Sequence, residues 1–221
     1  MPATAKAVVF DMDGTLVDNM HIHMQAWFDF LSRYGIRTTE EEFHAKNAGT
    51  ITEIIPRFFP EVTDPAEILR LGMEKEQVYR SLYSGQVTPL PGLVEFLDRL
   101  DAAGIPAGLA TAADRLNIDF TIDELGIRDR FRAITGAEQV QKGKPDPDVY
   151  LKTAASLGID PADCVAFEDS LPGIRSALSA GMRVVGVSTT HRREELQHLP
   201  LLHIIADYRT GDPVAFLNGK I

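Results

Sequence analysis

The chain has 221 residues, of which 44% are apolar, and 22 basic against 32 acidic residues give a formal net charge of −10. These ordinary values exclude global disorder, and the acidic balance argues against nucleic-acid binding, which needs a basic face. The single cysteine excludes an internal disulfide framework, and no apolar run approaches the roughly 20 residues of a membrane helix. Because residues 1–6 also carry no apolar signal core, we expect a cytoplasmic protein without a membrane partner, and take a monomer as the default.

Short apolar segments alternate with segments of helical periodicity along most of the chain. This alternation predicts an α/β fold with a Rossmann-like, mostly parallel sheet covered by helices. Strands are expected at residues 5–10, 105–111, 131–135, 164–167, 183–187 and 203–206. Helices are expected between them at residues 92–100, 148–157 and 173–180.

One region breaks the alternation, because helical periodicity without a convincing strand runs from about residue 17 to residue 88. Pro56, Pro60 and Pro65 punctuate this region. Its helices are expected at residues 21–34, 40–46, 51–59 and 65–82. An all-helical segment between the first two strands predicts an inserted cap domain. We therefore expect a core domain of residues 1–16 and 89–221, and a helical cap domain of residues 17–88.

Reactive side chains follow four of the predicted strands. They are Asp11 and Asp13 after the first strand, Thr111 after the second, Lys144 beyond the third, and Glu168 and Asp169 at the fourth. In an open parallel sheet, ligands gather at the carboxyl ends of the strands. Carboxylates that converge there repel one another unless a cation lies among them, and hard oxygen ligands suit Mg²⁺. A nearby lysine could neutralise a second anion, such as a phosphate.

These strand ends also carry a resemblance to a known family. The segment Asp11–Met12–Asp13–Gly14–Thr15 resembles the first motif of the haloacid dehalogenase-like (HAD) hydrolase superfamily. Thr111, Lys144 in Gly-Lys-Pro, and Glu168–Asp169 in Phe-Glu-Asp-Ser match the remaining motifs in order. The helical insertion falls where the first cap type of that family falls. The β-phosphoglucomutase-like phosphatases are the most similar branch, because Asp18–Asn19 is followed by His23 and by Ala26–Trp27.

The resemblance implies phosphoryl transfer with Mg²⁺ as the cofactor. It implies that Asp11 is the nucleophile that forms an aspartyl-phosphate, and that Asp13 is the general acid and base. Asp11, the backbone carbonyl of Asp13, and Asp169 would hold the metal ion. Glu168 would lie close to the ion or bind it directly.

The resemblance also implies how the phosphoryl group is held. Thr111 and Lys144 would bind its oxygens, and Ala112, which follows Thr111, would contact the substrate. Lys144 would in addition offset the negative charge around Asp11. Catalysis then rests mostly on positioning and electrostatic stabilisation, as phosphoryl transfer requires.

Three residues of the helical region are candidate substrate contacts, namely His23, Trp27 and Lys75. Asn19, His23 and Trp27 fall at i, i+4 and i+8, so they share a helix face. Because Asn19 starts near the catalytic loop, we interpret His23 as touching substrate or Asp13, the alternative being a histidine with a satisfied hydrogen bond. Trp27 is either packing or a wall of the substrate site. Lys75 stands where the mutase has a substrate-contacting lysine, although such charges are more often solvated.

Two departures from the mutase pattern bear on the reaction. The mutase binds a second phosphate with a cap arginine, where this chain has Thr52, and with a Ser-x-Ser-Lys-Asn loop. The corresponding loop here reads Thr111–Ala112–Ala113–Asp114–Arg115. An aspartate would repel the distal phosphate, and each lost charge-assisted contact costs about 1.5–3 kcal/mol, although Arg57 or Arg115 could compensate. We therefore expect weak or absent mutase activity, with water as the main phosphoryl acceptor.

The sequence thus predicts a Mg²⁺-dependent phosphatase that acts on a small phosphorylated metabolite, with a sugar phosphate as the expected substrate. A phosphosugar mutase and an inorganic pyrophosphatase are the alternatives, and the sequence alone cannot place Glu53, a cap residue that bears on the latter. A sensor that binds Mg²⁺ or a phosphometabolite without turnover is the non-enzymatic alternative. The pair Asp11 and Asp13 argues against it, because a binding-only site needs no nucleophile and acid.

Overall fold

The computed structural model describes residues 5–47, 50–209 and 217 of the chain. The backbone forms two compact units. One comprises residues 1–18 and 87–221 and is called the core unit here, and the other comprises residues 19–86 and is called the helical unit. The division of the chain into separate catalytic and cap domains stays a prediction.

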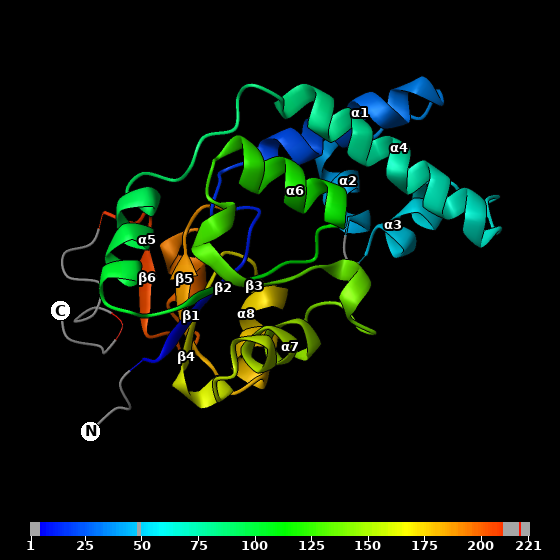
Figure 1. Ribbon diagram of the computed structural model, residues 1–221. Helices are drawn as coiled ribbons and strands as arrows, with labels where there is room; N and C mark the ends of the chain where they lie inside the picture. The colour runs from blue at the N-terminus through cyan, green and yellow to red at the C-terminus, as the bar shows by residue number, and fades with distance from the viewer. Residues whose placement is uncertain (1–4, 48–49, 210–216, 218–221) are drawn as a thin grey trace. The chain divides into compact units, whose positions relative to one another are not determined.

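A six-stranded parallel sheet lies at the centre of the core unit, in the order β3-β2-β1-β4-β5-β6 (Figure 1). Its strands are β1 (Ala7–Phe10), β2 (Ala107–Ala110), β3 (Phe131–Thr135), β4 (Cys164–Glu168), β5 (Arg183–Val187) and β6 (His203–Ile205). The chain builds outward from β1 to β3 and then returns to place β4 on the other side of β1. Parallel sheets bind ligands at such a reversal of strand order. The predicted α/β fold is confirmed.

Helices cover both faces of the sheet. They are α5 (Leu93–Ala102) and α6 (Arg115–Glu124) on one face, and α7 (Asp148–Leu157) and α8 (Leu171–Ser179) on the other. Strand β1 serves both layers, because Val8 and Phe10 pack toward α5 and α6 whereas Ala7 and Val9 pack toward α7 and α8. All four side chains are fully buried. A continuous apolar run is what a strand buried on both faces requires.

An aromatic cluster fills the layer beneath α5. The Phe10 ring stacks on the Phe167 ring of β4 at a centroid distance of 5.1 Å and contacts the Tyr208 ring at 5.9 Å. The Tyr208 hydroxyl donates to the backbone carbonyl of Thr15 at 3.0 Å. The cluster therefore joins the sheet to the loop that follows β1.

Helix α6 has no counterpart among the helices expected from the sequence. Its N-cap is Asp114, whose carboxylate accepts a hydrogen bond from the Asn117 N–H at 2.8 Å. The core unit also contains the short helix α9 (Arg193–Leu196) and the 3₁₀ turns η1 (Arg128–Arg130), η2 (Ala137–Gln139) and η3 (Pro161–Asp163). The ends of every predicted strand and helix lie within two residues of the observed ones.

The helical unit consists of α1 (Met20–Arg33), α2 (Glu40–Lys46), α3 (Ile51–Phe58) and α4 (Pro65–Tyr83). Helices α2 and α3 each begin with a capping box, in which Glu42 binds back to Thr39 and Glu53 binds back to Thr50. The unit encloses an aromatic core that includes Trp27, Phe30, Phe43, Phe58, Phe59 and Tyr83. Glu53, which bears on the pyrophosphatase alternative, thus has a structural role at a helix start.

The prolines of the helical unit differ in their effect. Pro65 is the first residue of α4 and follows the N-cap Asp64, a position where its missing N–H costs nothing. Pro56, in contrast, lies inside α3 and does not end it. Across both units, no helix of the described residues combines the length and the apolar character needed to cross a membrane.

Candidate active site

The loop after β1 begins with the two aspartates of the first motif. The Asp11 N–H donates to the carbonyl of Phe167 at 3.0 Å, which continues the pairing of β1 with β4 by one residue. The chain then turns at Gly14, whose φ of +76° lies in the left-handed region that glycine enters without steric cost. The Asp11 side chain is buried and the Asp13 side chain is half-buried. The turn therefore fixes Asp11 beside β4.

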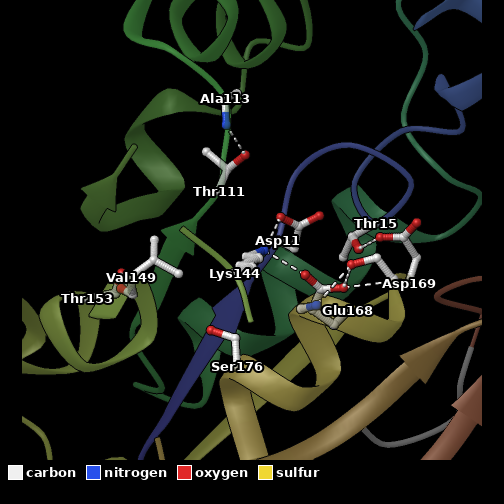
Figure 2. A network of polar contacts seen from close by, with 12 residues as sticks. Asp11, Thr15, Thr111, Ala113, Lys144, Val149, Thr153, Glu168, Asp169 and Ser176 are labelled. Atoms are coloured by element: carbon white, nitrogen blue, oxygen red, sulfur yellow. Dashed lines mark hydrogen bonds and ion pairs between the residues drawn. The ribbon is translucent and has the colours of Figure 1, made fainter. Parts of the chain in front are cut away.

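The ammonium group of Lys144 joins the first and fourth strand ends (Figure 2). Its Nζ atom lies 2.6 Å from Asp11 Oδ1 and 2.6 Å from Glu168 Oε1, and all three side chains are buried. The Tyr150 ring of α7 lies beneath the ammonium at 5.0 Å. Lys142, in contrast, has a largely exposed side chain whose Nζ lies 3.5 Å from the Asp146 carboxylate. Lys142 is therefore a surface charge, whereas Lys144 belongs to the buried site.

Ser170, the N-cap residue of α8, holds the Glu168 carboxylate. Its Oε2 atom accepts hydrogen bonds from the Ser170 N–H at 2.7 Å and from the Ser170 hydroxyl at 3.0 Å. The approach of the helix is so close that a Cβ atom at Gly173 would lie 1.6 Å from Glu168 Oε1. Glycine at this position therefore leaves the space that the carboxylate occupies.

The Asp169 carboxylate accepts a hydroxyl on each of its oxygens. Thr15 donates to Oδ1 at 3.2 Å, and Thr190, from the loop after β5, donates to Oδ2. A Cβ atom at Gly14 would lie 2.1 Å from Oδ2, so the β1 loop also approaches closely (Figure 2). Asp169 is 2% exposed. Its orientation is thus fixed from two loops that are far apart in the sequence.

Three carboxylates are close enough together to share a cation. Asp11, Glu168 and Asp169 each offer an oxygen, and these atoms all lie within 4.8 Å of one another. Three ionised carboxylates and one lysine would leave a buried net charge of −2 (−3 + 1 = −2). Buried oxygen ligands of this charge fit a hard divalent ion such as Mg²⁺. The Asp13 side chain is outside this group, and the role expected of its backbone carbonyl stays a prediction.

The electrostatics of the site agree with such a fit. Burial raises the pKa of Asp11 to about 7, against the attraction of Lys144. Burial and the negative charges of Glu168 and Asp11 hold the pKa of Asp169 well above its usual value. The pKa of Lys144 is raised, because Asp11 and Glu168 together outweigh the opposing effect of burial. Lys144 alone therefore does not compensate the negative charge of the three carboxylates. A bound cation would stabilise them in their charged form.

Thr111 lies at the end of β2, as expected. Its N–H donates to the carbonyl of Thr135 in β3 at 3.0 Å, and its side chain is 2% exposed. The Thr111 hydroxyl oxygen accepts a hydrogen bond from the Ala113 N–H at 3.0 Å (Figure 2). Ala112 between them is exposed. Binding of a phosphoryl group by Thr111 and of substrate by Ala112 stays a prediction.

The helical unit brings His23 and Lys75 together. Lys75 Nζ lies 3.2 Å from His23 Nδ1 and 2.9 Å from the Glu76 carboxylate, although Lys75 is only 2% exposed. The His23 ring stacks on the Tyr79 ring at a centroid distance of 3.8 Å. The hydroxyl of that tyrosine accepts a hydrogen bond from the buried Asn19 side chain at 2.7 Å. Lys75 is thus a buried, paired lysine rather than a solvated surface charge.

Trp27 has a different environment from His23. It is 3% exposed, its ring contacts Phe30 and Phe58, and Lys75 Nζ lies 5.3 Å from its centroid. This position fits the packing interpretation of Trp27. Substrate contacts of His23, Trp27 and Lys75 stay predictions.

Several residues that the structure places around the carboxylates have no role among those expected from the sequence. Thr15 and Ser170 stand inside the motifs that carried the resemblance, so the sequence contained a signal for them. Thr190 lies three residues after the end of β5. Because ligands gather at the carboxyl ends of parallel strands, its position in the sequence could have indicated it. Gly173 had no such signal, because its role arises from the close approach of a helix to a side chain.

Comparison with known proteins agrees with the geometry of these strand ends. The family model for haloacid dehalogenase-like hydrolases matches residues 5–181. The beta-phosphoglucomutase of Bacillus subtilis (strain 168) is 37% identical over 190 residues, which are 82% of this chain and 83% of the relative. The fructose-1-phosphate phosphatase YqaB of Escherichia coli (strain K12) is 33% identical over 183 residues, which are 81% of this chain and 95% of the relative.

A solved structure shares the fold over nearly the whole chain. It is a HAD hydrolase of family IA, variant 3, from Entamoeba histolytica HM-1:IMSS. It has a TM-score of 0.87 and 29% sequence identity, and the match covers 96% of this chain and 99% of that one. The chain belongs to the haloacid dehalogenase-like hydrolases. Within them it is a phosphohydrolase of the β-phosphoglucomutase-like branch.

Proposed function

We propose that the protein is a Mg²⁺-dependent phosphatase that hydrolyses a small phosphorylated metabolite, a sugar phosphate, through an aspartyl-phosphate on Asp11. The observation that carries this proposal is the buried contact of Lys144 Nζ with Asp11 and Glu168, 2.6 Å from each. The names of the two enzyme relatives, a fructose-1-phosphate phosphatase and a beta-phosphoglucomutase, support a sugar phosphate as the substrate. A cytoplasmic location and a monomeric state remain expectations from the composition.

In the first half-reaction, a carboxylate oxygen of Asp11 attacks phosphorus and the bond from phosphorus to the leaving oxygen breaks. Asp13, which lies in the same loop as Asp11, donates the proton that the leaving alcohol needs. Lys144 stays beside Asp11 and offsets the negative charge that accumulates on the phosphoryl oxygens. Thr111, at the end of β2, offers its hydroxyl to the same oxygens.

In the second half-reaction, water attacks the phosphorus of the aspartyl-phosphate, and the bond to the Asp11 oxygen breaks. Asp13 takes the proton from the attacking water, so the carboxyl group returns to its starting state. Asp11, Glu168 and Asp169 are the side chains that would hold Mg²⁺, with the Asp13 carbonyl as a further ligand. The positive charge of the ion would stabilise the negative charge on the phosphoryl oxygens and on the buried carboxylates.

The loop after β2 favours hydrolysis over the mutase reaction. Asp114 is the N-cap residue of α6, and its carboxylate accepts a hydrogen bond from the Asn117 N–H at 2.8 Å. In the mutase pattern, a lysine at this position contributes to binding of a second phosphate. Thr52 replaces the expected arginine, and its hydroxyl lies 3.0 Å from that of Thr50. Neither residue supplies a positive charge for a distal phosphate.

Phosphate release by the purified protein tests the proposal. The substrates are hexose and pentose phosphates, phosphoglycolate, pyrophosphate, and β-glucose 1-phosphate with the bisphosphate primer, each with and without Mg²⁺. We expect release from a sugar phosphate that requires Mg²⁺ and that falls by several orders of magnitude in Asp11→Asn, since this variant lacks the nucleophile. The variant also controls for contaminating phosphatases.

Other outcomes select the alternatives. Conversion of β-glucose 1-phosphate to glucose 6-phosphate faster than hydrolysis identifies a mutase. Preferential cleavage of pyrophosphate identifies a pyrophosphatase. Binding of Mg²⁺ without turnover of any phosphate compound identifies a sensor. Equal release by Asp11→Asn and the unaltered chain means that the activity does not depend on Asp11, so another nucleophile or a contaminant produces it and the proposal loses its support.

A further inference from the structure

The loop after β5 reaches two elements of the candidate active site through neighbouring threonines. Thr190 donates to Oδ2 of Asp169, and the Thr189 hydroxyl donates to the carbonyl of Gly14 at 2.5 Å. Thr190 is itself exposed, whereas the carboxylate that it binds is 2% exposed. A surface loop from the fifth strand thus contacts a buried carboxylate at the end of the fourth.

We propose that Thr190 is a positioning residue that orients Asp169 for divalent-cation binding. This inference rests on the proposed function, in which Asp169 is a metal ligand. Thr190 touches neither the phosphoryl group nor the ion in this proposal, and it acts only through the carboxylate. The assigned interaction is the hydrogen bond between the Thr190 hydroxyl and Asp169 Oδ2.

The two hydroxyls on Asp169 explain why this orientation matters. An ion that binds one oxygen of the carboxylate still leaves the other oxygen with a hydroxyl donor, from either Thr15 or Thr190. The carboxylate plane is therefore fixed before the ion arrives. Groups that hold a metal ligand in place in this manner typically contribute about 10- to 100-fold to metal affinity.

The repulsion within the site increases the importance of the contact. Asp169 lies with Asp11 and Glu168 inside a group of oxygens no more than 4.8 Å apart. Lys144 binds the other two carboxylates and not Asp169 among the ion pairs of the described residues. Without the hydroxyl of Thr190, the Thr15 hydroxyl would be the one remaining donor of the two that hold the Asp169 carboxylate against this repulsion.

Binding of Mn²⁺ to the full chain, measured by the loss of the free-ion signal in electron paramagnetic resonance, tests the proposal. The variants are Thr190→Val, which keeps the shape, and Thr190→Ser, which keeps the hydroxyl. Ser188→Ala is the matched control, because it removes a hydroxyl from the same loop that donates to the Ile205 carbonyl instead. Thermal unfolding without metal shows whether each variant is folded, and Thr190→Ala replaces Thr190→Val if the latter is not.

We expect Thr190→Val to raise the Mn²⁺ dissociation constant about tenfold, and Thr190→Ser and Ser188→Ala to stay close to the unaltered chain. An unchanged dissociation constant in folded Thr190→Val would overturn the inference while leaving the metal site intact. Equal losses in Thr190→Val and Thr190→Ser would also overturn it, since the variant that keeps the hydroxyl would then bind Mn²⁺ no better than the variant that lacks it. Failure of the unaltered chain to bind Mn²⁺ would overturn the metal-dependent function and this inference together.

Discussion

Single residues shape the candidate active site as much by the space they leave as by the groups they carry. Lys144 contributes a charge, whereas Gly14 and Gly173 contribute the absence of a side chain beside Asp169 and Glu168. At Gly14 the left-handed backbone would also favour glycine. At Gly173 no such backbone requirement exists, so the close approach to Glu168 alone explains glycine there.

The Gly173→Ala variant tests this explanation. The new methyl group must displace the Glu168 carboxylate and so disturb the contact of that carboxylate with Lys144. Because a misplacement of about 1 Å in a catalytic site can cost about 100-fold, we expect kcat/KM for the best substrate to fall by about that factor. Steady-state phosphate release measures the effect.

A matched glycine serves as the control. In Gly186→Ala, the nearest atom to the new Cβ is the flexible end of Leu201 at 2.9 Å, and no carboxylate lies near it. We expect this variant to keep its activity. Similar activities in Gly173→Ala and Gly186→Ala would show that Glu168 tolerates displacement.

At the scale of elements, helix starts account for residues that the sequence presented as functional candidates. Asp114 begins α6 and Glu53 completes a capping box at the start of α3. A carboxylate that accepts a backbone N–H at a helix start is stabilised there and also interacts favourably with the helix dipole. These residues therefore have a structural explanation that does not require a ligand.

The Asp114→Ala variant tests that explanation. Loss of the N-cap is expected to lower the free energy of unfolding in urea by about 0.5–2 kcal/mol, and Asp114→Asn is expected to retain most of the stability. The same variants test the repulsion expected from the sequence. If charge repulsion by Asp114 suppresses mutase activity, both substitutions would raise glucose 6-phosphate formation, whereas the capping role predicts no such gain.

At the scale of the whole molecule, the parallel sheet buries the only cysteine of the chain. Cys164 begins β4 and is fully buried, and its thiol donates weakly to the Asp160 carbonyl at 3.5 Å. Burial, followed by the negative charges of Asp163 and Asp160, raises the pKa of this thiol to about 11 from an ordinary value of 9.0. The folded protein therefore keeps the thiol proton over a range in which the unfolded chain loses it.

This difference predicts how stability depends on pH. Above pH 9.0 the unfolded chain releases the Cys164 proton, while the folded protein holds it up to about pH 11. The free energy of unfolding is therefore expected to fall as the pH rises through this range. Urea unfolding at several pH values, compared between the unaltered chain and Cys164→Ala, isolates this contribution. Parallel pH profiles for the two proteins would contradict the raised pKa.

Much of the fold could be read from local patterns. The strand at 131–135 and the helix at 148–157 have the predicted bounds, because apolar runs and helical periodicity are properties of neighbouring residues. Helix α6 was missed because its hydrophobic pattern is weak: Leu116 is exposed while the polar residues Asn117 and Thr121 are buried. The motifs likewise indicated the strand ends that carry Asp11, Lys144 and Glu168.

The fold class, the family and the strand ends that bear the candidate chemistry follow from the sequence alone, because motifs and periodicity are properties of residues that are close together in the chain. The folded chain is needed to show that Lys144 bridges two carboxylates, that Gly173 makes room for one of them, and that Thr190 holds a third. The contacts of Lys144 and Thr190 join residues that parallel strand pairing brings together from distant positions, and the contact of Gly173 depends on how closely α8 approaches the end of β4. Their geometry depends on sheet order and helix approach, which no local pattern encodes.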